Sequence, residues 1–138
     1  MIPAGARGGL LAGRRHAEAL MTDTCAIKRA NGTTTQDATT GTVSDGYDTL
    51  VTTKCKLQMP TAIARPQEVG GRTSFMVRLE LHLPVGTTPE IKADDIVTVT
   101  AVGDLSDVNL LNRTFRVVGP PAKSLATALR FEVQEYAS

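Results

Sequence analysis

The strongest constraint on the fold is a nine-residue stretch, 75–83, in which large apolar and polar side chains alternate. Successive side chains of a β-strand point to opposite faces, so this period of two buries one face and leaves Arg78, Glu80 and His82 in water. A sheet is therefore expected to form the core. The five apolar residues at alternate positions are Phe75, Val77, Leu79, Leu81 and Leu83.

The length and net charge of the chain limit the number of domains and the kinds of partner that it can have. The chain has 138 residues, 41% of them hydrophobic, which is enough for one core and predicts a single domain over 1–138. The net charge of +1 produces no global attraction to nucleic acid or to an anionic membrane. No apolar run approaches the roughly 18 residues of a spanning helix, and no secretion signal is present. We expect a soluble protein that is made in the cytoplasm.

Five further stretches have the composition of strands, with no helical crossovers between them. Lys54 and Lys56 mark the wet face of one, and Leu129, Phe131 and Val133 the buried face of another. The pattern predicts a mainly β fold: a small antiparallel β-barrel or sandwich of about six strands within 24–138, with a short N-terminal α-helix and two long loops. The five stretches are 24–29, 50–57, 96–102, 115–118 and 129–134.

The N-terminal segment, 5–21, predicts a short, basic, amphipathic helix. Four glycines before position 14 weaken its beginning, since each costs up to about 1 kcal/mol relative to Ala. A helix this short needs a surface, either its own sheet or a neighbouring subunit. The residues expected on its apolar face are Leu10, Ala17, Leu20 and Met21.

Two polar excursions interrupt the strands. The first, 31–48, opens on the turn signal Asn31-Gly32, contains no Lys or Arg, and is expected to be solvated. The second, 60–72, has a Pro- and Gly-rich composition that does not suit a sheet, and is expected to be a loop. Its length calls for a function.

The two cysteines, Cys25 and Cys55, lie in different predicted strands. A disulfide would form only if those strands pair. The alternative, which suits a reducing compartment, is two buried thiols that behave as small hydrophobic side chains.

No pattern predicts a catalytic, cofactor or metal site. His16 and His82 have no metal-ligand spacing to a cysteine or to each other. The pair Asp94-Asp95 precedes a strand, where Asp is ordinary turn chemistry. Asp104 and Asp107 lack the ordered series of oxygen ligands of a calcium loop, so solvated loop acids are expected. We therefore expect that the protein is not an enzyme.

Single-strand binding by a small barrel would require exposed aromatic side chains for base stacking. Aromatic residues make up only 4% of the chain, and its three Phe residues lie on predicted inner faces. The arginines of the N-terminal helix, with Arg65 and Arg72 in the second excursion, form modest basic patches that would become a band of charge only if repeated around a ring.

The second half of the chain resembles the small head-tail connector proteins of tailed bacteriophages, and most closely the head-completion or head-tail stopper type. Three runs carry the resemblance. They are Leu83-Pro84-Val85-Gly86 with Ile91-Lys92-Ala93-Asp94-Asp95-Ile96-Val97, then Asn112-Arg113-Thr114-Phe115-Arg116-Val117-Val118-Gly119-Pro120-Pro121, and finally Ala128-Leu129-Arg130-Phe131-Glu132-Val133.

The resemblance implies a structural virion protein, assembled in the host cytoplasm, that forms a homo-oligomeric ring between portal or adaptor and tail proteins. Phage DNA would pass through the ring without sequence-specific binding. Tail terminator, adaptor ring and small nucleic-acid-binding barrel stay open as alternatives. On this hypothesis the candidate channel loop comprises Arg65, Pro66, Glu68, Gly70, Gly71 and Arg72, and the candidate subunit contacts are Arg7, Arg14, Arg15, Asp37, Asp45 and Asp48.

Overall fold

The computed structural model describes residues 3–58, 66–69, 72–75, 78–119 and 126–135. One helix, α1 (Ala4–Ala19), precedes a set of strands, and a 3-10 helix, η1 (Val108–Leu110), lies between the sixth and seventh strands. The strands are β1 (Asp23–Gln36), β2 (Val43–Gln58), β3 (Pro66–Val69), β4 (Arg72–Phe75), β5 (Arg78–Leu83), β6 (Ile96–Ala101), β7 (Thr114–Gly119) and β8 (Leu129–Glu135).

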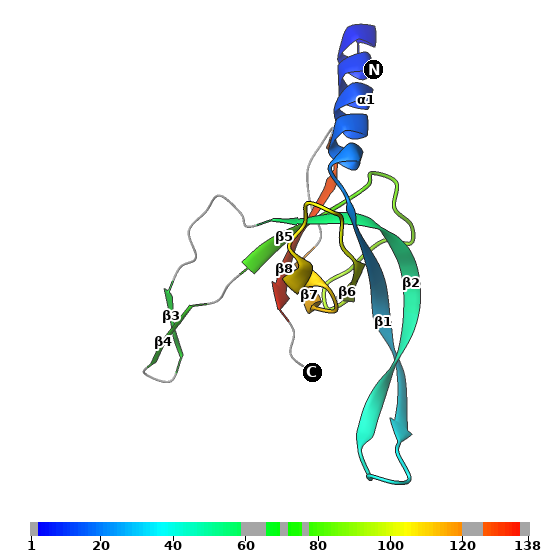
Figure 1. Cartoon of the computed structure of the whole chain (residues 1–138), viewed down its shortest axis with the longest axis vertical. Helices are drawn as coiled ribbons and strands as arrows, with labels where there is room; N and C mark the ends of the chain where they lie inside the picture. The colour runs from blue at the N-terminus through cyan, green and yellow to red at the C-terminus, as the bar shows by residue number, and fades with distance from the viewer. Residues whose placement is uncertain (1–2, 59–65, 70–71, 76–77, 120–125, 136–138) are drawn as a thin grey trace.

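Six of these strands form one closed antiparallel sheet (Figure 1). Their order is β1, β2, β5, β8, β7, β6, and β6 pairs back onto β1. Closure satisfies the backbone groups that an open sheet would leave unpaired at its two edges. The predicted mainly β fold, with about six antiparallel strands and one N-terminal helix, is confirmed.

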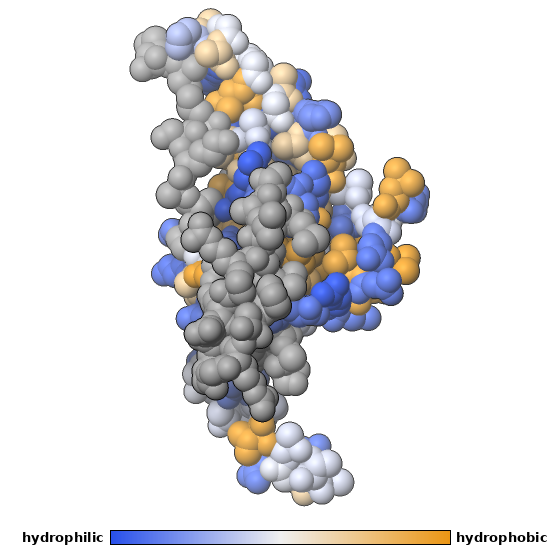
Figure 2. All heavy atoms as spheres, turned by 90° about the vertical axis from the view of Figure 1, so that its left-hand side faces the viewer, coloured by the Kyte–Doolittle hydropathy of each residue, from blue (hydrophilic) through white to orange (hydrophobic). Residues whose placement is uncertain are grey.

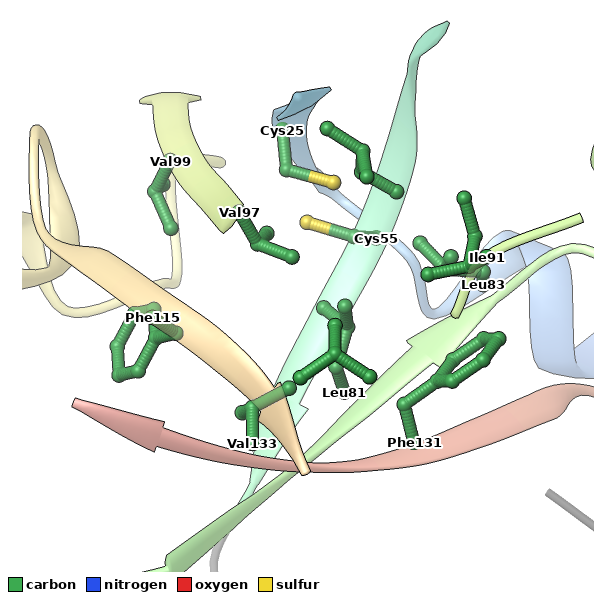
Figure 3. Packing of buried hydrophobic residues seen from close by; sticks show 12 residues of the cluster. Cys25, Cys55, Leu81, Leu83, Ile91, Val97, Val99, Phe115, Phe131 and Val133 are labelled. Carbon is green, nitrogen blue, oxygen red and sulfur yellow. The ribbon is translucent and has the colours of Figure 1, made fainter. Parts of the chain in front are cut away.

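The core fills the inside of the closed sheet (Figure 3). Leu81 and Leu83 of β5 are fully buried and Leu79 packs against them, as the alternation predicted. Phe115 and Phe131 are also buried, which confirms that they belong to the inner faces. The other fully buried side chains are Cys25, Ile27, Cys55, Val97, Val99, Val117 and Val133.

Cys25 on β1 and Cys55 on β2 are both free and fully buried. Their strands pair, and Figure 3 shows the two sulfurs directed toward each other inside the core. A hydrogen bond with Cys25, together with burial, raises the pKa of the Cys55 thiol, so this group stays neutral. The prediction of two buried thiols is confirmed.

The predicted nine-residue strand over 75–83 is wrong at its beginning. The strand in the closed sheet, β5, begins at Arg78, whereas Phe75 ends β4 and pairs with Pro66 of β3. The two intervening residues, 76–77, lie outside the described part of the chain. Alternation shows that a stretch is extended, but it does not show where the chain leaves one sheet for another.

The excursion 60–72 is not simply a loop. Pro66–Val69 and the strand that begins at Arg72 form an antiparallel hairpin, separate from the closed sheet. Proline is tolerated at the first residue of an edge strand, which is its place here. Residues 60–65 and 70–71 of this excursion lie outside the described part.

The predicted turn at Asn31-Gly32 is wrong. β1 continues through it to Gln36, and the chain reverses at residues 37–42, where the Gly41 N–H donates to the Asp37 carbonyl oxygen. Gly32 has a φ of 77° and lies where the register between β1 and β2 shifts. Positive φ serves a β-bulge as well as a hairpin turn, so the Asn-Gly signal fitted both.

His82 was expected to face water, but only 7% of its surface is exposed. Its ring nitrogen Nε2 lies 2.7 Å from Oε1 of Glu80. Burial lowers the pKa of His82, partly opposed by Glu80, while the nearby cations Arg130 and Lys56 lower it further. The outer face of a closed sheet is curved and crowded by neighbouring strands, so alternation alone does not make a position wet.

Candidate interaction surfaces

Helix α1 has no buried residue, and the hydrogen bond and ion pair that join it to the rest of the described chain come from its C-terminal half. The Arg14 Nε–H donates to the Ala126 carbonyl oxygen at 3.0 Å, and Lys54 Nζ lies 3.3 Å from a carboxylate oxygen of Glu18. The helix ends at Ala19 rather than at the expected 21, and Met21 is buried beyond it. The N-terminal half extends away from the sheet (Figure 1).

An exposed stripe runs along α1 at four-residue spacing: Arg7, Leu11 and Arg15, which we call the helix stripe. Residues four apart lie on the same side of a helix. Arg14, by contrast, is bonded to the chain's own backbone and does not belong to the free side. The helix contains three arginines and one glutamate, so its exposed part is basic.

A two-stranded ribbon, residues 29–49, projects from the opposite end of the molecule (Figure 1), and we call it the arm. Lys28 is the last residue of β1 that pairs with β6, and beyond it β1 pairs only with β2. No residue of 30–49 is buried. The expectation of a solvated excursion is thus right about exposure and wrong about structure, because the segment is an ordered ribbon.

The arm carries three carboxylates and no lysine or arginine after Arg29. Asp37 accepts a hydrogen bond from the Thr39 N–H, which lowers the pKa of its carboxyl. Asp48 accepts one from the Asn31 side chain. Asp45 shares one side of the ribbon with Val43 and Tyr47, since alternate residues of a strand lie on one face. We call these last three the arm face; all are exposed.

Figure 2 shows the lower end of the molecule, where the arm ends, as mostly pale spheres broken by an apolar group. The pale colour agrees with the many Thr, Ser and Gly residues of the arm. The arm is therefore a polar, acidic surface that carries isolated apolar side chains.

A salt bridge fixes the base of the arm to the closed sheet. The Arg29 guanidinium donates to both carboxylate oxygens of Asp95 at 2.9 Å, and Asp95 also accepts from the Lys92 N–H. Asp95 is almost fully buried, and the hydrogen bond to it raises the pKa of Arg29. Asp94 has a φ of 71°, which agrees with the turn chemistry expected there. The role of Asp95 was missed, because its partner lies far away in sequence.

A second feature missed by sequence reasoning is the loop between β6 and β7, for which only the solvated acids Asp104 and Asp107 are predicted. Leu105 is fully exposed, and Val108 and Leu111 are also exposed. The Gly103 N–H donates to the buried Asp23 carboxylate and fixes the loop close to the end of α1. The sequence offered one signal for this exposed apolar group: three large apolar residues, spaced three apart, lie outside any strand pattern.

The structure places the candidate channel loop as follows. Pro66 and Glu68 are in β3 and Arg72 begins β4. Arg65, Gly70 and Gly71 lie outside the described residues. The hairpin stands to one side of the closed sheet, on a different side from α1 and from the arm (Figure 1).

Within the described ranges, no group of three His, Cys, Asp or Glu side chains could hold a metal ion. Asp107 accepts from the Asn109 N–H and caps η1, and Asp104 is exposed. Over the same part of the chain, none of the helical residues form a segment that is both long and apolar enough to cross a membrane.

The architecture defines a class of small, closed antiparallel sheets with projecting elements. Residues 13–134 match the model of DUF6093, a family of unknown function, and the chain belongs to that family. No curated protein matches the chain. The solution structure of protein SF1141 from Shigella flexneri 2a is similar in fold, with a TM-score of 0.53, 17% identity, and coverage of 85% of this chain and 94% of that one.

Proposed function

We propose that this protein is a structural virion protein of a tailed bacteriophage. In this proposal the closed sheet is a small barrel, and copies of it form a ring at the head-tail interface as a head-completion or stopper protein. The ring connects the portal or adaptor to the tail and helps to retain the packaged DNA. The resemblance of residues 83–133 to such connectors supports the proposal.

The observation that carries the proposal is that α1 and the arm extend from opposite ends of the closed sheet without burying a residue. An isolated helix of 16 residues is marginally stable in water, and so is a two-stranded ribbon. Elements of this kind gain stability from surfaces outside their own subunit. A protein whose two extensions both need such surfaces suits an assembly better than a solitary function.

The proposal assigns the candidate residues as follows. The arginines of α1 and the carboxylates of the arm make subunit or ring contacts. The segment 65–72 faces the channel, with Gly70-Gly71 as a hinge and with Arg65 and Arg72 setting the charge that passing DNA meets. This assignment makes the DNA contact electrostatic and independent of sequence.

Tail terminator and adaptor rings are the alternatives within the same class. The alternative from another class, a nucleic-acid-binding barrel, has less support. Two of the three phenylalanines, Phe115 and Phe131, are in the core, where they cannot stack on bases.

The experiment that tests the proposal removes the gene from a phage that encodes this chain and examines the particles by electron microscopy. A connector predicts DNA-filled heads and separate tails, with joined particles restored by the wild-type chain in trans. Filter binding of the purified chain to oligonucleotides is the companion measurement. Normal joined particles without the chain, or tight salt-dependent oligonucleotide binding by a monomer, would overturn the proposal.

A further inference from the structure

Helix α1 and the arm carry opposite charge at opposite ends of the molecule. The helix stripe is basic, with Arg7 and Arg15 on either side of Leu11, and residues 30–53 contain three aspartates and no lysine or arginine. Figure 1 shows the two elements at the two ends of the longest axis, so they cannot meet within one subunit. Each can meet the other only on a second copy.

We propose that the helix stripe of one copy packs on the arm face of the next copy, so that successive subunits join head to tail. The inference rests on the proposed function, because it supplies the contact by which copies form the ring. A subunit that presents different patches to its two neighbours forms a ring when the rotation from one subunit to the next closes on itself.

The pattern of side chains on the two surfaces is complementary. The helix stripe reads basic, apolar, basic, and the arm face reads apolar, acidic, apolar: Val43, Asp45 and Tyr47. Four residues of helix rise about 6 Å and two residues of strand about 6.8 Å, so three side chains on each element have nearly the same spacing. The two elements must be offset by one position, since alignment without an offset would place Leu11 on Asp45. With that offset, Leu11 lies against Val43 or Tyr47 and one of the two arginines reaches Asp45.

The charged side chains of α1 and the arm that lie outside the helix stripe and the arm face already have partners within the chain's own fold. Arg14 and Glu18 are already engaged with the chain's own Ala126 and Lys54, and Asp48 with Asn31. No hydrogen bond or ion pair within the described residues uses the side chains of Arg7, Arg15 or Asp45. Contact with a second copy would stabilise both a glycine-weakened helix and a polar ribbon.

The test exchanges charge between the two surfaces. One variant carries Arg7→Glu and Arg15→Glu, and the other carries Asp45→Lys. Each variant alone brings like charges together at the contact. Sedimentation velocity should show that it self-associates at least about tenfold more weakly than wild type. An equimolar mixture restores association, because the acidic helix meets the basic arm and the unchanged helix meets the unchanged arm.

The controls separate folding and net charge from the contact. Asp104→Lys makes the same change in net charge as Asp45→Lys, at an exposed loop position, and should associate as wild type does. Circular dichroism checks that each variant is folded, which is expected since none of the substituted residues is buried. Raising the salt concentration should weaken wild-type association.

The outcomes distinguish the inference from the proposed function. Wild-type association by either variant alone, failure of the mixture to associate, or a wild-type chain that stays monomeric would overturn the head-to-tail contact. Joining of heads and tails by both variants would discard the contact and leave the connector function standing. Joined particles in the absence of the gene would remove the connector function whatever the mixing experiment gives.

Discussion

At the scale of single residues, the contribution of a polar side chain to stability depends more on whether it is buried and hydrogen-bonded than on which residue type it is. Asp23, His82 and Asp95 are all buried, and each has a hydrogen-bonding partner: the Gly103 N–H, Glu80 and Arg29. An unpartnered buried polar group costs about 1–3 kcal/mol, so these partners are as necessary as the apolar core. Two of these residues also fix surface elements: Asp95 holds the base of the arm, and Asp23 holds the loop between β6 and β7.

His82 should make stability depend on pH. Burial lowers the pKa of His82 in the folded chain below the ordinary value of about 6.5, so below that pH the unfolded chain binds a proton that the folded chain does not. The contribution of neutral His82 to the free energy of unfolding should therefore be fully present above about pH 6.5, and the free energy of unfolding should decrease as the pH falls below that value.

Urea unfolding between pH 5 and 7.5 measures this effect. His82→Gln should flatten the decrease, whereas His16→Gln, on an exposed part of α1, should keep it. An unchanged slope in His82→Gln would show that another group is responsible.

At the scale of elements, the extensions depend on a few fixed points near the closed sheet. The arm is held by Arg29 and Asp95, and α1 by the hydrogen bond of Arg14 and the ion pair of Glu18. The elements beyond these points have no buried residue, so the points determine their direction. Changes at the fixed points should therefore affect one extension and leave the core intact.

Asp95→Asn should loosen the arm. The substitution removes the charge that the Arg29 guanidinium meets at 2.9 Å on both carboxylate oxygens, and so weakens a bidentate pair. Amide hydrogen exchange in residues 29–49 should become faster than in wild type. Asp94→Asn is the matched control, because Asp94 is exposed and Asn tolerates its positive φ. Equal exchange in the two variants would contradict the role of the salt bridge.

Substituting glycine in α1 should stabilise the helix according to position. A Cβ added at Gly8 or Gly9 meets nothing within 4 Å, so each change to Ala should stabilise the helix by about 0.5–1 kcal/mol. A Cβ at Gly13 would lie 3.1 Å from the Thr127 methyl carbon, so Gly13→Ala should give less. Hydrogen exchange of the α1 amides measures the difference. A gain at Gly13 equal to that at Gly8 would show that α1 does not contact Thr127.

At the scale of the whole molecule, three projecting elements leave a closed sheet in different directions (Figure 1). The sheet holds the core and every fully buried side chain that the structure describes. The extensions hold most of the residues to which the proposal assigns contacts. This division lets the surface change without loss of the fold.

Deleting Pro66–Gly71 should leave the closed sheet folded, because β3 and β4 pair only with each other among the described strands. On the proposed function, the resulting particles should lose packaged DNA. A replacement of the same six residues by a Gly-Ser segment of equal length separates the effect of length from that of side chains. The measurement is nuclease-sensitive DNA outside purified heads. If both variants retain their DNA, segment 65–72 does not take part in DNA retention.

The fold was largely predictable, and the surfaces less so. Leu81, Leu83, Phe131 and Val133 lie on the inner face as alternation indicated. The long-range partner of Asp95 and the burial of His82 could not be predicted, because both depend on which strands become neighbours. The arm was hidden by Asn31-Gly32, whose geometry suits a bulge as well as a turn.

Patterns along the chain are enough to predict a mainly β fold, an apolar face on each core strand, and a basic helix in the N-terminal segment. Local preference and periodicity act within a few residues, so they are readable along the chain. Three features become visible only in the folded chain: the sheet closes, β3 and β4 form their own hairpin, and the basic helix and the acidic arm extend from opposite ends. These features depend on pairing between strands distant in sequence, which no local pattern specifies.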